Sequence, residues 1–226
     1  MTGLIIDTSG PWLNLAVCRE DEILASISQD TGNQQAERLP FELGNILAKA
    51  KVKLSEADWL AVTAGPGSFT GLRVGVSFAQ GLALGSGIRL LPLNTLDAMA
   101  CLPEGFSGEL SPMMDAKKGQ VYTALYRSEN GISDPVSSYQ VIEPQAWLSR
   151  LAPRTKVFGS GAYAYREMIS QSYPELMMDE AYINGPEISG LVKLVLKELN
   201  QNKFVPAEVL DAFYIRPSDA VVKRHA

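Results

Sequence analysis

Residues 74–88 form a run of fifteen residues without a charged side chain, and the run directly follows a turn rich in glycine. A helix that covers one face of a sheet normally carries charge on its outer side, but here the residues are apolar or small all round. A membrane span needs about 18–20 apolar residues, whereas Arg73 and Arg89 bound this run. We therefore expect a helix buried on both faces, in the protein's own core or against a second polypeptide.

The first half of the chain surrounds this helix with strand patterns. Three short apolar segments predict an antiparallel meander, and a single apolar stripe over residues 35–51 predicts a helix. The expected strands cover residues 4–7, 12–17, 23–27, 59–63 and 88–93, and the expected helices cover 35–51 and 72–85. This order is typical of a ribonuclease-H-like lobe with a sheet of mixed direction.

The second half starts the same plan again. Residues 111–115 predict a strand that ends in Asp115, as the first strand ends in Asp7. Residues 120–126 alternate apolar and polar side chains, and Asn130-Gly131 signals a tight turn. Helices are also expected over 145–151, 163–172 and 188–200, with a strand over 156–158.

Two such halves predict an α/β, two-lobed actin-like fold (ASKHA, ribonuclease-H-like) with mixed sheets flanked by helices. The lobes are expected at residues 1–97 and 98–204, and the tail 205–226 is a candidate to return to the first lobe.

The composition excludes several classes of protein. With 20 Lys and Arg against 25 Asp and Glu, the net charge is −5, which disfavours a free-standing nucleic-acid binder. The single histidine, His225, cannot supply a Ser-His-Asp system or a histidine metal site. Cys18 and Cys101 form no C-x-x-C pair, and the N-terminal residues lack a signal-peptide pattern. We expect a cytoplasmic protein without a metal or other cofactor.

The turn before the uncharged helix, residues 65–75, reads Gly-Pro-Gly-Ser-Phe-Thr-Gly-Leu-Arg-Val-Gly. A dinucleotide fingerprint would have its third glycine one residue earlier, a P-loop would end in Gly-Lys-Ser/Thr, and a nucleophile elbow needs G-x-S-x-G. Two interpretations stay open. The glycines either permit a sharp turn and close helix packing, or expose helix N–H groups to a phosphate.

An actin-like cleft would hold nucleotide phosphates between the lobes, with acidic residues at strand ends binding magnesium through water. Four residues are weak candidates for such a site: Asp7, Ser9, Gly67 and Asp115. Each aspartate is equally interpretable as the polar end of a buried strand. Lys117-Lys118 could attract phosphate or form a solvated turn.

Ile6-Asp7-Thr8-Ser9, Glu37-Arg38-Leu39-Pro40 and the 65–75 turn together resemble the bacterial TsaB family, also called YeaZ. Residues 115–122 are similar to that family's second hairpin, and Tyr214-Ile215-Arg216 also fits. The resemblance implies a part in synthesis of N6-threonylcarbamoyladenosine (t6A), beside the anticodon of tRNAs that read codons starting with adenine. It also implies a non-catalytic subunit that pairs with its paralogue, the transferase TsaD, or with itself, and is joined by the ATPase TsaE. The resemblance further implies that this chain binds tRNA only indirectly, through the complex.

TsaD carries a metal-binding H-x-x-x-H on the helix that resembles residues 35–51. Here the corresponding segment, Gln34-Gln35-Ala36-Glu37-Arg38, contains no histidine. The resemblance therefore implies that the metal and the transferase chemistry are absent. The rival hypothesis is a weak actin-like ATPase or transferase that uses Asp7, Asp115 and the 65–71 loop.

Periodicity gives each of the two predicted helices an apolar stripe. If the uncharged helix packs its other side on its own sheet, both stripes are free to meet a partner helix pair. The predicted partner interface is Leu39, Leu43, Ile46, Leu47, Leu72, Val76, Ala79 and Ala83. Val76→Glu is then expected to give a folded monomer that no longer captures TsaD.

Overall fold

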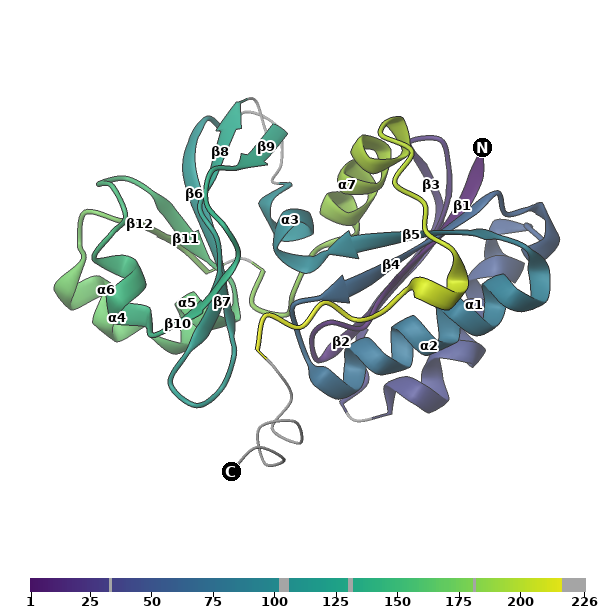
Figure 1. Ribbon diagram of the computed structural model, residues 1–226, viewed down its shortest axis with the longest axis horizontal. Helices are drawn as coiled ribbons and strands as arrows, with labels where there is room; N and C mark the ends of the chain where they lie inside the picture. Colours follow the sequence, from purple (N-terminus) through teal and green to yellow (C-terminus); the bar gives the residue numbers. More distant parts are fainter. Residues whose placement is uncertain (33, 102–105, 130–131, 181, 217–226) are drawn as a thin grey trace.

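The computed structural model describes residues 1–32, 34–101, 106–129, 132–180 and 182–216. The chain forms two sheets with their own helices, side by side (Figure 1). The turn predicted at Asn130-Gly131 and the tail beyond residue 216 lie outside the described residues.

The first sheet contains five strands in the order β3-β2-β1-β4-β5. Its strands are β1 (Thr2–Asp7), β2 (Trp12–Arg19), β3 (Glu22–Asp30), β4 (Trp59–Gly65) and β5 (Arg89–Asn94). The first three pair antiparallel, and β1, β4 and β5 run parallel, so the mixed direction predicted from the sequence is confirmed.

Helices cover both faces of this sheet. On one face lie α1 (Gln35–Ala50) and α2 (Phe69–Ser86), and on the other lie α3 (Thr95–Ala100) and α7 (Ile188–Asn200) (Figure 1). Side chains alternate along a strand, so Leu4 and Ile6 pack under α1 and α2 while Ile5 packs under α7. Burial on both faces explains why the central strands β1 and β4 are almost wholly buried and mainly apolar, whereas β3 at the edge is largely exposed.

The second sheet has the order β10-β7-β6-β11-β12, with β8 pairing to β6 and β9 to β8. Its strands are β6 (Gly108–Asp115), β7 (Val121–Thr123), β8 (Tyr126–Glu129), β9 (Ile132–Pro135), β10 (Gln140–Ile142), β11 (Lys156–Phe158) and β12 (Met177–Asp179). Its helices are α4 (Pro144–Leu148), α5 (Ser160–Ala164) and α6 (Arg166–Ser172). Two short 3-10 helices cover Leu54–Glu56 and Ala207–Val209.

Two elements predicted as continuous are broken in the structure. Residues 120–126 divide into β7, which pairs with Met113–Asp115 of β6, and the start of β8, which pairs with residues 108–110. The predicted helix over 163–172 ends and restarts at Tyr165, between α5 and α6. Periodicity within one segment cannot show that a strand changes its pairing position.

Although the sequence predicts that α7 belongs to the second lobe, Leu191, Leu194 and Val195 of this helix pack against Ile5, Ala16 and other residues of the first sheet. The segment after α7 follows the same sheet, because the N–H of Val205 donates to the carbonyl of Leu90 at 2.9 Å. We propose that residues 1–97 and 188–216 form the first lobe and residues 98–187 the second.

Candidate functional site

Asp7, at the end of β1, is the centre of a buried hydrogen-bond cluster. Its Oδ1 accepts from the backbone N–H of Ser9 (3.0 Å), the Ser9 hydroxyl (2.6 Å) and the Thr63 hydroxyl (2.7 Å). Its Oδ2 accepts from the amide of Asn14 at 2.8 Å. Asp7 is 1% exposed. A carboxylate has about four acceptor positions, so these four donors use most of its capacity. Asp7 holds the turn after β1 in shape.

Asp115, at the end of β6, forms its bonds within its own hairpin. Its Oδ1 accepts from the N–H of Lys117 (2.8 Å), and its Oδ2 from the Lys117 ammonium (2.7 Å). The backbone N–H of Asp115 donates to the Ser160 hydroxyl at 3.0 Å. The hydrogen bonds of Asp115 and Asp7 share no partner, so each aspartate anchors its own turn.

The glycines of the 65–75 turn lie against the turn after β1. A Cβ at Gly67 would overlap the carbonyl oxygen of Ser9, and one at Gly71 the carbonyl oxygen of Thr8. A Cβ at Gly75 would overlap the Thr8 hydroxyl, which donates to the Gly71 carbonyl at 2.7 Å. Gly67 and Ser9 thus meet through their backbones. The structure favours close helix packing over phosphate contact as the reason for these glycines.

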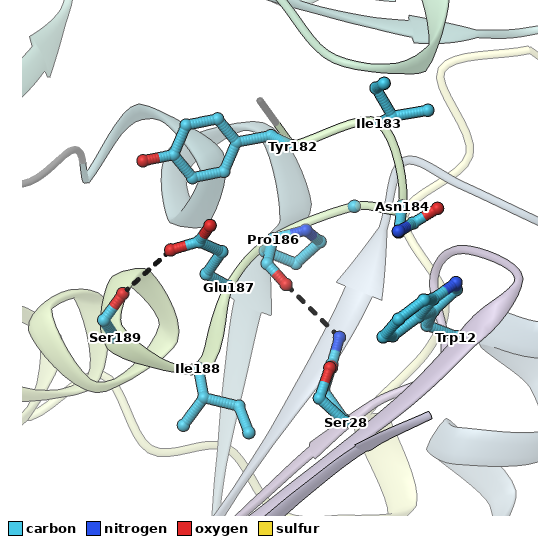
Figure 2. Close-up of a pocket in the computed structure, with 11 residues that line it drawn as sticks. Trp12, Ser28, Tyr182, Ile183, Asn184, Pro186, Glu187, Ile188 and Ser189 are labelled. Carbon is cyan, nitrogen blue, oxygen red and sulfur yellow. Dashed lines mark hydrogen bonds between the residues drawn. The ribbon is translucent and has the colours of Figure 1, made fainter. Parts of the chain in front are cut away.

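The turn after β1 is covered on its other side by the segment before α7. A Cβ at Gly10 would lie 2.7 Å from the carbonyl oxygen of Asn184. Next to it is a pocket of about 440 Å³, lined by Trp12, Asn14, Ser28 and residues 182–189. Figure 2 shows Trp12 near Asn184 on one wall, with Tyr182 and Glu187 on the opposite wall.

The chemistry of this pocket does not suit a phosphate. Glu187 is the charged residue among those that line it. Burial, with the nearby charges of Glu187 and Asp179, raises the pKa of Tyr182 to about 12. The amide of Asn14 donates to the carbonyl of Pro186 at 3.2 Å, so it too is engaged. The negative charge of Glu187 repels a nucleotide's phosphates, and the engaged amide of Asn14 is not free to bind them.

A partly buried hydrogen-bond cluster, which the sequence does not predict, joins the lobes. Asp97 of α3 accepts hydrogen bonds from the hydroxyls of Tyr126 (2.6 Å) and Tyr139 (3.0 Å) of the second lobe. Burial raises the pKa of Asp97, although both tyrosine bonds oppose the rise. The only sequence signal is an acidic residue on a short apolar helix, which does not reveal its distant partners.

Residues 210–216, which we call the C-terminal strap, also cross from one lobe to the other (Figure 1). The N–H of Phe213 donates to the carbonyl of Ala64 at 2.6 Å, and its ring meets Tyr139 at 5.8 Å between centroids. The guanidinium of Arg216 donates to the carbonyl of Ala116 at 3.0 Å and to the side chain of Gln120.

Comparisons with known proteins agree with these motifs. A family model for TsaD, tRNA N6-adenosine threonylcarbamoyltransferase, matches residues 25–206. The tRNA threonylcarbamoyladenosine biosynthesis protein TsaB of Bacillus subtilis is 32% identical over 172 residues, 75% of each chain. The protein of the same name from Escherichia coli is 27% identical over 219 residues, 94% of each chain. The structure of YeaZ from Pseudomonas aeruginosa superposes with a TM-score of 0.80 at 26% identity, covering 94% of this chain and 99% of that one.

The chain belongs to the TsaB family. It is at the same time a member of the wider family that the TsaD model describes. The two-lobed, actin-like α/β architecture predicted from the sequence is confirmed.

The segment that the sequence predicts to lack the transferase's metal ligands, residues 34–38, lies at the start of α1. Gln35 is buried there, and its amide donates to the carbonyl oxygens of Gly10 (2.8 Å) and Trp12 (3.4 Å). Over the described part of the chain, no group of three His, Cys, Asp or Glu residues is placed to hold a metal ion.

The predicted partner interface is wrong, because its side chains face the protein's own core and not a partner. Seven of its eight residues are buried in the protein's own core, and Leu47 is partly buried against it. The stripe of α2 faces the sheet because Gly71 and Gly75 bring that side onto Thr8. The buried residues are Leu39, Leu43, Ile46, Leu72, Val76, Ala79 and Ala83.

The opposite sides of α1 and α2 form what we call the outer face. Phe41 is 62% exposed and Leu84 is 65% exposed. At Gly44, Gly81 and Gly85 a Cβ would meet no atom within 4 Å, so the backbone itself is accessible. Among the described residues, no helix is long and apolar enough to span a membrane.

Proposed function

We propose that this chain is a non-catalytic subunit in the synthesis of t6A in tRNA, acting as a partner of the transferase TsaD. The curated relatives carry the name of that biosynthesis, and the TsaD family model covers most of the chain. The proposal includes the ATPase TsaE as a further partner and places the protein in the cytoplasm, where tRNA is modified. tRNA meets this chain only within the complex.

The commitment of its polar groups is the observation that carries the non-catalytic role. Asp7 already accepts four hydrogen bonds, and Asp115 is bonded to Lys117. A catalytic carboxylate needs a free oxygen near its substrate. At the start of α1, where the resemblance implies a metal-binding histidine in TsaD, this chain has Gln35, whose amide donates to the backbone carbonyl of Gly10. These contacts support a scaffold rather than the rival ATPase.

A scaffold needs a surface for its partner, and the outer face supplies one. Exposed apolar side chains such as Phe41 and Leu84 are typical of the centre of an interface, and the glycines beside them permit close approach of another helix. We propose that TsaD and a second copy of this chain bind the same outer face. They then exclude each other.

Depletion of the protein tests the biosynthetic role. We expect the t6A content of bulk tRNA, measured by mass spectrometry of nucleosides, to fall and to recover on re-expression of the wild type. An unchanged t6A content would contradict the proposal.

ATP hydrolysis by the purified chain tests the rival. We expect a rate no higher than that of buffer. A measurable rate that is lost in Asp115→Asn would favour an enzyme.

A further inference from the structure

One surface of this acidic chain gathers cations and aromatic rings. It consists of residues from the start of α2, the C-terminal strap and the turn between β6 and β7, and it spans the two lobes (Figure 1). We call it the strap surface and define it as Phe69, Arg73, Lys117, Tyr214 and Arg216.

Contacts within the strap surface hold Arg73 in place. Its guanidinium lies 3.9 Å from the centroid of the Phe69 ring, and its Nε donates to the hydroxyl of Tyr214 at 3.2 Å. The rings of Phe69 and Tyr214 are 5.2 Å apart between centroids. Phe69 is still 40% exposed. An arginine pre-positioned beside an accessible ring needs little further ordering to bind a ligand.

The strap surface continues through Arg216 to the second lobe. The bond from Arg216 to the carbonyl of Ala116 places its guanidinium beside the β6–β7 turn, whose Lys117 side chain is 81% exposed. Lys117 pairs with Asp115 at 2.7 Å, and the exposed side of its ammonium stays open to a phosphate. The surface is thus continuous from α2 to the second sheet.

The charge of the strap surface differs from that of the whole chain. The surface carries three cations, while Asp115 is bonded to it, Asp211 lies on the same strap and the chain has a net charge of −5. Among the described residues, no ion pair that we identify includes Arg73 or Arg216. Arginines without acidic partners favour an anionic ligand.

We propose that the strap surface contacts tRNA within the complex with TsaD, its cations binding phosphates and the Phe69 ring meeting an unpaired base. This inference rests on the proposed function. RNA fits better than an acidic peptide, because unpaired bases stack on aromatic rings and arginine planes. Each phosphate contact contributes only about 0.7–0.9 to the slope of log affinity against log salt. Three such contacts on an acidic chain are too few for tight binding, so the contribution is measurable only when TsaD supplies the rest.

The test is binding of an unmodified tRNA transcript to the assembled complex of this chain with TsaD, measured by fluorescence anisotropy from about 50 to 200 mM salt. We expect Arg73→Gln and Lys117→Gln each to weaken binding and to reduce the salt slope by about one. Arg216→Gln should act similarly, but it also loosens the strap, so the first two variants decide. Arg89→Gln is the matched control, because its guanidinium lies 4.1 Å from the centroid of Phe204, away from the strap surface.

Equal affinity and salt slope in wild type, Arg73→Gln, Lys117→Gln and Arg89→Gln would overturn the proposal. A second outcome would also overturn it: the strap variants capture less TsaD, while the complex that still forms binds tRNA with unchanged affinity. The strap surface would then contact an acidic protein partner instead of tRNA. Because binding is measured without modification, this failure is distinct from failure of the proposed function, which would appear as normal t6A in depleted cells.

Discussion

Asp7 shows how a residue with a catalytic appearance can be structural. Its side chain is buried and accepts hydrogen bonds from Ser9, Thr63 and Asn14. Asp7→Ala would leave these donors buried without an acceptor. We expect the free energy of unfolding to fall by roughly 3 kcal/mol in urea titrations, since each buried unsatisfied group costs about 1–3 kcal/mol.

Asp21→Ala, at an exposed turn position, is the control and should change stability by less than about 0.5 kcal/mol. If Asp7→Ala were as stable as this control, the cluster around Asp7 would not support the fold.

Asp97 is expected to make stability depend on pH. Burial raises its pKa from 3.8, against the effect of bonds from Tyr126 and Tyr139 and of the charge of Lys197. A carboxyl group whose pKa is higher in the folded state stabilises the fold fully below its unfolded pKa, and this contribution is lost as the pH rises through the folded pKa. The free energy of unfolding of wild type should therefore fall relative to that of Asp97→Asn as the pH rises above 3.8 and through the raised pKa of Asp97. A pH-independent difference between the two proteins would contradict this assignment.

At the scale of elements, the glycines of α2 divide into two kinds. Gly71 lies against the Thr8 backbone, so Gly71→Ala forces a main-chain shift and should lower the free energy of unfolding by roughly 1–3 kcal/mol. Gly81 faces open space, so Gly81→Ala should raise it by about 0.5–1 kcal/mol through helix propensity. Thermal unfolding of both variants measures the contrast. Destabilisation of similar size in both would mean that propensity and close packing have been assigned wrongly.

The sequence predicted α1, α2 and α7 well because each has a long periodic pattern. It could not show which side of α2 meets the sheet, since that helix is apolar or small all round and both sides satisfy the same pattern. The deciding contact, between Gly75 and the hydroxyl of Thr8, joins residues far apart in the chain. Short elements such as α3 and β12 carried no periodic signal at all.

The structure changes the result that we expect for Val76→Glu, which the sequence predicts to be a folded monomer. Val76 is 5% exposed within the core cluster of α1, α2 and the first sheet. A glutamate there is buried without a partner, at a cost of several kcal/mol, so the chain should unfold. Circular dichroism of the purified variant measures this. A folded, monomeric Val76→Glu protein would contradict this and would mean that the Val76 side of α2 contacts a partner.

At the scale of the whole molecule, the lobes are joined by contacts that no local pattern encodes. Asp97 bonds to tyrosines of the second lobe, and Phe213 and Arg216 of the strap reach across. The two-lobed plan could be predicted because each half starts with a strand that ends in an aspartate. The return of α7 to the first sheet could not, because an amphipathic helix fits either sheet.

The central claim is that this chain works by docking through its outer face rather than by chemistry of its own. The most direct measurement is sedimentation of the purified chain with TsaD, comparing Leu84→Glu with Val136→Glu. Leu84 is 65% exposed on α2, and the control Val136 is 47% exposed on the second lobe. We expect both variants to fold, Val136→Glu to bind TsaD as the wild type does, and Leu84→Glu to sediment alone as a monomer. A folded Leu84→Glu protein that still sediments with TsaD would contradict it.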